Sequence, residues 1–195
     1  MGLKKMIVNY KTKLIQIKIV YYGCALSGKT TSLKSLFNKF GKNGELTSIE
    51  TTTGRTLFFD FGTLKMIGGE WMVKILLYSA TGQDFYSSTR PATLSGTDGI
   101  VFVIDSQKKY FDDNYRSWKE LHYYFAEKVF KIPIVLSLNK RDLPDVIDIN
   151  DVINKYELNK FKTTQIIETI ALSGKGVTKT FKSIMSLIFP SVTIR

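Results

Sequence analysis

The sequence predicts one α/β domain, with a mostly parallel six-stranded sheet, one antiparallel edge strand and helices on both faces. Short apolar segments typical of buried strands, such as Gly99–Asp105 and Ile132–Leu138, alternate with segments of helical periodicity. The 195 residues are 44% hydrophobic and contain no repeat or Pro-rich tract, which suits a single domain over residues 1–195.

The first half of the chain supplies three of the expected strands. Leu14–Val20 alternates and then becomes fully apolar, as a strand entering a sheet does. The glycines 68 and 69 separate two strand-like segments, which predicts a hairpin and the antiparallel edge strand. In order we expect a strand, a helix, a long loop and two hairpin strands: Leu14–Val20, Thr31–Phe40, Gly41–Thr53, Thr56–Met66 and Trp71–Tyr78.

The second half continues the alternation of strands and helices. It starts with a second polar loop, Ala80–Ser95, and a strand with a continuous apolar run. The remaining elements are three helices and two strands at Asp112–Val129, Ile132–Leu138, Ile149–Tyr156, Gln165–Ile170 and Val177–Phe189.

The formal net charge of +11 indicates either a basic surface without a specific partner or attraction to an anionic membrane or acidic partner. Lysines are frequent in residues 1–13, which we interpret as a basic N-terminal extension. No nucleic-acid-binding motif accompanies the charge, so we expect no nucleic-acid partner.

Other features favour a cytoplasmic protein. The single cysteine, Cys24, cannot form an internal disulfide, and no apolar run approaches the roughly 18–20 residues of a membrane helix. No signal peptide is evident. Met6 replaces the Ser or Thr of a myristoylation signal, and the C-terminus is no prenylation box, so any membrane contact is expected to be peripheral.

Residues 23–30 match the phosphate-binding pattern G-x-x-x-x-G-K-[ST]. They follow a predicted strand and open a predicted helix, where backbone N–H groups and the helix dipole attract anions. Lys29 is expected to reach the β- and γ-phosphates, Thr30 to bind Mg²⁺, and Cys24 to pack rather than react. The predicted nucleotide contacts here are Gly23, Cys24, Ala25, Leu26, Ser27, Gly28, Lys29, Thr30 and Thr31.

A second motif, Asn139-Lys140-Arg141-Asp142, follows a buried strand and predicts guanine as the base. The Asp142 carboxylate accepts hydrogen bonds from the N1–H and amino group of guanine, a donor pair that adenine lacks. Asn139 is expected to brace the loop, and the stem of Lys140 to lie along the base. An ATP-using kinase is disfavoured by Asp142.

With these motifs the chain resembles a Ras-superfamily GTPase from about Leu14 to Phe189. Where that superfamily has Asp-x-x-Gly-Gln, this chain has Ser79-Ala80-Thr81-Gly82-Gln83. A hydroxyl residue in place of the Asp is typical of MglA-like GTPases, the gliding-motility and polarity switches of bacteria with archaeal relatives. Further similar stretches are 18–23, 26–31, 55–61, 98–103 and 139–144.

The resemblance implies roles for residues outside the two motifs. Gly82 would donate its N–H to the γ-phosphate, and Gln83 would orient the attacking water. Arg55 would act in cis on the γ-phosphate, although a surface charge at a strand end is the alternative. Thr56 is the preferred switch contact for Mg²⁺, with Thr51, Thr52 and Thr53 as rivals.

Further expectations concern the loop at Ala171-Leu172 and the side chains of Asp60 and His122. The Ser-Ala-Lys sequence of Ras-like GTPases is reduced here to the Ala of Ala171-Leu172, whose backbone would meet the base. Asp60 would compensate for the missing Asp, but we favour an edge-strand carboxylate without a metal role. His122 lacks metal-ligand neighbours at suitable spacing and is expected to be surface-exposed or half-buried.

The resemblance implies a molecular switch that binds GTP or GDP with Mg²⁺ and hydrolyses GTP slowly, controlled by a homodimeric roadblock/longin-domain (MglB-like) activator. Two alternatives stay open. One is a GTP-dependent binding scaffold with little hydrolysis, and the other is an Arf-like or signal-recognition-receptor-like trafficking GTPase with an N-terminal amphipathic helix.

Overall fold

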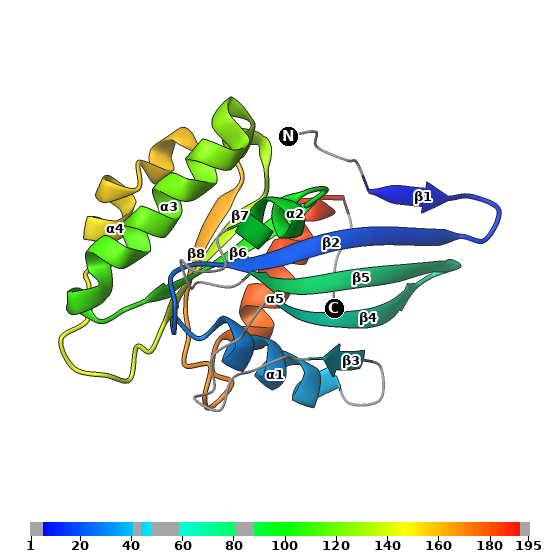
Figure 1. Ribbon diagram of the computed structural model, residues 1–195. Helices are drawn as coiled ribbons and strands as arrows, with labels where there is room; N and C mark the ends of the chain where they lie inside the picture. The colour runs from blue at the N-terminus through cyan, green and yellow to red at the C-terminus, as the bar shows by residue number, and fades with distance from the viewer. Residues whose placement is uncertain (1–5, 41–43, 48–58, 81–87, 192–195) are drawn as a thin grey trace.

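A single sheet runs through the molecule and determines where the other elements lie (Figure 1). The computed structural model describes residues 6–40, 44–47, 59–80 and 88–191. Over these residues, the strands are β1 (Ile7–Asn9), β2 (Leu14–Tyr22), β3 (Gly44–Thr47), β4 (Phe59–Gly68), β5 (Trp71–Ala80), β6 (Gly99–Asp105), β7 (Ile134–Asn139) and β8 (Thr164–Glu168).

The strand order is β3-β4-β5-β2-β6-β7-β8, with β1 paired to the beginning of β2. The strands β5, β2, β6, β7 and β8 form the parallel part, and β1, β3 and β4 run antiparallel to their neighbours. The predicted α/β class is therefore confirmed, and all six expected strands are present.

The expected strand number was too low, because the described part of the sheet has eight strands. β1 lies inside the segment 1–13 that we interpreted as an extension, and β3 lies inside the expected loop Gly41–Thr53. With three and four residues, both are too short to show periodicity. β3 pairs with β4, so the predicted edge strand has neighbours on both sides.

Helices cover both faces of the sheet, with α1 and α5 on one face and α3 and α4 on the other (Figure 1). α2 lies in the expected loop Ala80–Ser95, and α3 ends four residues before the predicted Val129, where a 3₁₀ helix takes over. The bounds are α1 (Lys29–Phe40), α2 (Arg90–Leu94), α3 (Phe111–Phe125), α4 (Ile149–Lys155) and α5 (Val177–Ile188), with 3₁₀ helices η3 (Lys108–Tyr110), η4 (Ala126–Lys131) and η5 (Leu158–Lys160).

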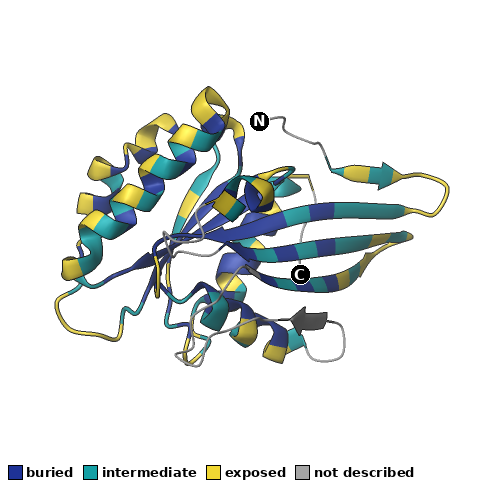
Figure 2. Ribbon diagram, in the orientation of Figure 1, coloured by how far each residue is buried: buried dark blue, intermediate teal, exposed yellow. Residues whose placement is uncertain are grey.

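The two faces of the sheet carry separate hydrophobic cores, seen as the dark interior of Figure 2. Under α3 and α4 the core is aromatic: the Phe102 ring lies 5.1 Å from Trp118 and 6.2 Å from Tyr156, centroid to centroid. His122 is half-buried beside Trp118, as expected, and burial lowers its pKa. None of the described helices has the length and apolar character needed to cross a bilayer.

The aromatic core yields a stability prediction. Phe102 is fully buried, so truncation to Ala removes its transfer energy and leaves a cavity. We expect Phe102→Ala to lower the free energy of unfolding by about 3–5 kcal/mol, measured by chemical denaturation with GDP in excess. The control is Tyr123→Ala, since Tyr123 is exposed on α3; an equal loss in both variants would contradict the assigned core.

Candidate functional site

The loop between β2 and α1 can be built only with glycine at two of its positions. Gly23 and Gly28 have φ values of 142° and 101°, which disfavour other residues. A Cβ on Gly23 would lie 2.2 Å from the Val103 carbonyl oxygen, and one on Gly28 would lie 2.2 Å from Asn139 Nδ2. The glycines therefore let the loop pack directly against the ends of β6 and β7.

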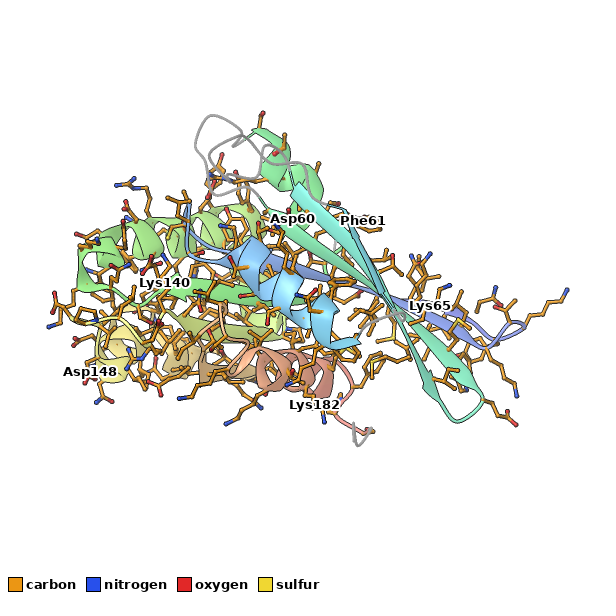
Figure 3. The ribbon with its side chains drawn as sticks, turned by 90° about the horizontal axis from the view of Figure 1, so that it is seen from below. Asp60, Phe61, Lys65, Lys140, Asp148 and Lys182 are labelled. Carbon is orange, nitrogen blue, oxygen red and sulfur yellow. The ribbon has the colours of Figure 1, made fainter. Side chains whose placement is uncertain are left out.

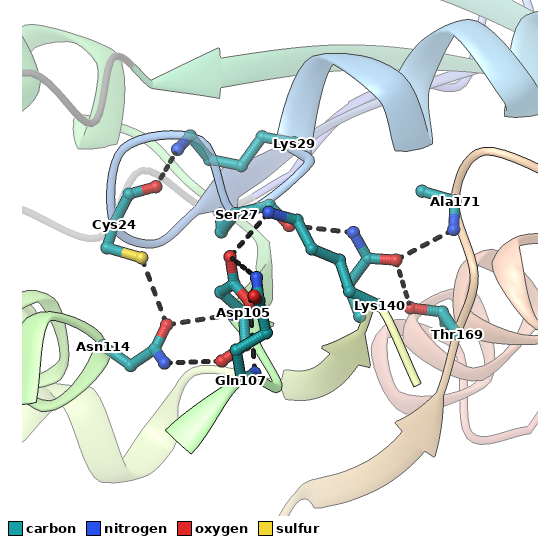
Figure 4. Close-up of polar contacts among 10 residues, drawn as sticks. Cys24, Ser27, Lys29, Asp105, Gln107, Asn114, Lys140, Thr169 and Ala171 are labelled. Atoms are coloured by element: carbon teal, nitrogen blue, oxygen red, sulfur yellow. Dashed lines mark hydrogen bonds and ion pairs between the residues drawn. The ribbon is translucent and has the colours of Figure 1, made fainter. Parts of the chain in front are cut away.

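Lys29 folds back across the mouth of this loop. Its Nζ donates hydrogen bonds to the carbonyl oxygens of Gly23, at 3.0 Å, and Cys24, at 2.6 Å (Figure 4). Burial disfavours the charged ammonium and lowers the pKa of Lys29 to about 8. An anion in the loop would stabilise this charge, so the geometry suits phosphate.

Asn139, the last residue of β7, joins the phosphate loop to the loop after β8. Its Nδ2 donates to the Ser27 carbonyl at 2.8 Å, and its Oδ1 accepts from the Ala171 N–H at 2.8 Å and the Thr169 hydroxyl at 3.2 Å. Asn139 thus braces the loop as expected. The Ala171 N–H, predicted to meet guanine, already donates to Asn139, so a base oxygen would have to share it.

Lys140 is held by a carboxylate at the end of the neighbouring strand. Its Nζ lies 2.6 Å from Asp105 Oδ2, and Asp105 also accepts from the Gln107 backbone at 3.1 Å (Figure 4). Lys140 has a left-handed φ of 65°. The ion pair fixes the ammonium and leaves the lysine stem along the pocket.

Asn114 of α3 ties this strand end to the phosphate loop. Its side chain bonds both the N–H and the C=O of Asp105, at 3.0 and 2.8 Å, and accepts from the Cys24 thiol at 3.1 Å. Burial raises the pKa of Cys24, which agrees with a packing residue rather than a nucleophile. Asp105 and Asn114 were missed in the sequence because neither belongs to a recognised motif.

A pocket of about 260 Å³ opens where these loops meet. The phosphate loop and both base-site motifs therefore converge on one cavity, with Asp142 and Leu172 at its exposed rim. Its lining contains the predicted contacts Leu26, Gly28, Thr31, Asn139, Lys140, Asp142, Ala171 and Leu172, together with Leu143 and Ile170.

Asp60 is placed beside Ser79 and the phosphate loop, which corrects our preferred interpretation of it as an edge-strand carboxylate. Asp60 on β4 pairs directly opposite Ser79 on β5 and is fully buried. Its Oδ2 accepts from the Thr30 hydroxyl at 2.5 Å. The Ser79 hydroxyl is buried, and no described residue hydrogen-bonds to it. Figure 3 shows Asp60 on β4 above α1.

Four predicted switch residues, Arg55, Thr56, Gly82 and Gln83, lie outside the described residues, as do the alternatives Thr51–Thr53. The expected loop Ala80–Ser95 is described again from residue 88, and the first residue of α2 in this loop is anchored. Arg90 is buried, and its Nη1 lies 2.7 Å from both Glu120 oxygens on α3.

Comparison with known proteins shows the family of this chain. The sequence profile of the ADP-ribosylation factor family matches residues 3–188. The mutual gliding-motility protein MglA of Myxococcus xanthus is 39% identical over 189 residues, covering 93% of this chain and 94% of that protein. The chain is an MglA-like small GTPase of the Ras superfamily. ADP-ribosylation factor-like protein 6 of Caenorhabditis elegans is 28% identical over 175 residues, covering 88% and 86%.

This MglA-like GTPase is accordingly a nucleotide-dependent switch that hydrolyses GTP. The expected family, fold and activity are confirmed. The trafficking alternative required an N-terminal amphipathic helix. Residues 7–9 instead form β1, and residues 10–13 form a turn; residues 1–5 lie outside the described part.

Asn139 provides a test of how this GTPase assembles its nucleotide site. Asn139→Ala removes three hydrogen bonds and leaves buried polar groups unsatisfied, at about 1–3 kcal/mol each. We expect the dissociation constant for GDP to rise by about ten-fold or more, measured by fluorescence titration.

Ser137→Ala is the matched control for Asn139→Ala. It removes a 2.8 Å bond to Thr169 in the same network without cutting the link to the phosphate loop. Equal losses of GDP affinity in the two variants would show that general loosening, and not this link, controls binding.

Proposed function

We propose that this GTPase switches with Mg²⁺-bound guanine nucleotide and takes its metal-site carboxylate from Asp60 on β4. The observation that carries the proposal is the 2.5 Å contact between Asp60 and the Thr30 hydroxyl, the predicted metal ligand of the phosphate loop. The resemblance to Ras-like proteins places the carboxylate at position 79, which is serine here.

Sheet register explains how one residue replaces the other. Residues directly opposite on antiparallel strands have Cβ atoms about 4.5–5.5 Å apart, so a carboxylate from either strand reaches nearly the same space. Asp60 and Ser79 are such a pair. Serine at position 79 is smaller than aspartate and leaves room for Asp60, and the Ser79 hydroxyl, to which no described residue hydrogen-bonds, adds a polar group for a metal-bound water.

The donor set fits Mg²⁺, which favours hard oxygen ligands and retains several waters. Thr30 would bind the ion directly and Asp60 through water, with Thr56 as the proposed switch ligand. When bound, Mg²⁺ would supply positive charge that offsets the charge developing on the phosphates. Lys29, already held at the loop mouth, would provide the second positive charge.

The remaining roles follow the site geometry and the family. Asp142 at the pocket rim would select guanine, and Lys140, fixed by Asp105, would cover the base with its stem. Gln83 would orient the attacking water, Arg55 would stabilise charge on the γ-phosphate, and Gly82 would sense it through its N–H. We propose slow intrinsic turnover and a roadblock/longin-type homodimer as the activator, because a switch must persist between signals.

The Asp60 proposal is tested by GDP release. Asp60→Asn keeps the size of the side chain but removes its charge, so Mg²⁺ should bind much more weakly. In the natural protein, adding a chelator should speed the release of a fluorescent GDP analogue strongly. In Asp60→Asn we expect fast release already in Mg²⁺ and a chelator effect at least about ten-fold smaller, a difference of about 1.4 kcal/mol.

Returning the carboxylate to β5 sharpens the test. Asp60→Asn combined with Ser79→Asp should recover the Mg²⁺ dependence, because the two positions face each other. Asp151→Asn on the exposed surface of α4 is the control for lost charge. An unchanged chelator effect in Asp60→Asn would overturn the proposed metal role and leave the GTPase assignment intact.

A variant at Gln83 tests the proposed hydrolysis of GTP, and an activator assay tests its regulation. Gln83→Leu cannot orient water, so the single-turnover rate of GTP hydrolysis should fall by about a hundred-fold or more, the scale expected of a positioned proton-transfer group. Phosphate release measures the rate, and GDP affinity should not change. A cognate roadblock protein should accelerate the natural protein; rapid unaided turnover without any response would contradict the regulated switch.

A further inference from the structure

The two hairpins β1–β2 and β4–β5 extend beyond the helices, at the strand ends that lie away from the nucleotide pocket (Figure 1). Their turns are joined: the Met72 N–H donates to the Lys13 carbonyl at 2.8 Å, and the Tyr10 ring packs edge-on against Trp71 with centroids 5.7 Å apart. We call residues 7–14 and 65–74 the hairpin end.

The hairpin end exposes an unusual share of apolar surface. Eight large hydrophobic side chains are exposed among the described residues, and three of them line the nucleotide pocket. Four of the other five belong to the hairpin end: Ile67 is 82% exposed, Tyr10 78%, Ile7 54% and Met72 41%. Such clustering marks an interaction site rather than scattered surface residues.

Strand register places most of these side chains on one uncovered face. Ile67 pairs opposite Met72, which pairs with Leu14. In the next row Lys65 pairs opposite Lys74, followed by Gln16 and Ile7. On this face the row nearest the β4–β5 turn is therefore apolar at Ile67 and Met72, and the row behind it is basic at Lys65 and Lys74. Figure 2 shows the hairpin ends in the colours of partial and full exposure.

The hairpin end has a net positive charge. It holds four lysines, Lys11, Lys13, Lys65 and Lys74, against one acid, Glu70, which pairs with Lys13. Like charges directly opposite on neighbouring strands are destabilising. Lys65 and Lys74 form such a pair, and no described acidic side chain forms an ion pair with either. An anionic partner would relieve this repulsion.

We propose that the hairpin end docks onto an anionic lipid bilayer. Ile67 and Met72, at the projecting end, would enter the headgroup region, while Lys65 and Lys74 one row behind would meet lipid phosphates. The Tyr10–Trp71 pair has the amphipathic character that favours the membrane interface. A bilayer fits better than an acidic protein because the hairpin turn that carries Ile67 and Met72 projects from the body (Figure 3). Of the four apolar residues, Ile7 lies further back and borders a groove beside Gln16.

Vesicle binding tests this proposal, which does not depend on the metal site. The purified GDP-bound chain should co-sediment with phosphatidylcholine vesicles that contain phosphatidylserine, and only weakly with phosphatidylcholine alone. Lys65→Glu with Lys74→Glu should lower the binding constant by about ten-fold or more, as should Ile67→Ser with Met72→Ser. Binding should weaken as salt rises.

The matched control for charge is Lys119→Glu with Lys155→Glu, which makes the same change on α3 and α4, away from the hairpin end. It should retain vesicle binding within a few-fold, and GDP affinity verifies that every variant is folded. Equal losses in the control and test pairs would show net-charge attraction and overturn the proposal. Failure of the natural chain to bind these vesicles would also overturn it.

Tryptophan fluorescence gives an independent readout. The sequence has two tryptophans: Trp71 lies in the hairpin end, and Trp118 is buried under α3. Vesicles with brominated acyl chains should quench the emission of Trp71 on binding, since bromine quenches only at short range. Bound protein without quenching would place the contact elsewhere and contradict the proposed docking.

Discussion

The side-chain amide of Asn139 is the contact on which the nucleotide site depends. From the end of β7 it reaches the phosphate loop through Ser27 and the loop after β8 through Ala171, so one buried group sets the spacing between the phosphate and base halves. The rest of the local sequence accommodates it. Gly28 must lack a side chain because its Cβ would overlap Asn139 Nδ2, and the Thr169 hydroxyl completes the hydrogen bonding of Asn139 Oδ1.

The motifs were predictable because each is a contiguous string with its own local mechanism. Residues 23–30 and 139–142 sit where strands meet loops, and the structure brings both to one pocket. Asp105 and Asn114 were not predictable in this way, because their roles arise from packing of α3 against the strand ends. The short strands β1 and β3 were not predicted for another reason, since three or four residues carry too little periodicity to distinguish a strand from a loop.

Asp60 shows why a single sequence undervalues a residue that acts across a sheet. The sequence displayed a missing carboxylate at Ser79 and a spare one at Asp60, but only strand register makes them direct neighbours. A carboxylate on an isolated strand is ordinarily a surface group, whereas Asp60 is buried and accepts a hydrogen bond from Thr30. The turn between β4 and β5 sets this register, with Gly68 opposite Trp71, and the glycines predicted the hairpin without fixing which residues pair across it.

The buried position of Lys29 has a consequence for nucleotide exchange. Burial of its ammonium lowers its pKa, and two carbonyl oxygens accept its hydrogen bonds without supplying a negative charge. Releasing the nucleotide withdraws the anion best suited to this charge. A protein that catalyses exchange would therefore lower the barrier to nucleotide release by presenting a carboxylate to Lys29. That carboxylate would serve as a temporary counterion until the next nucleotide binds.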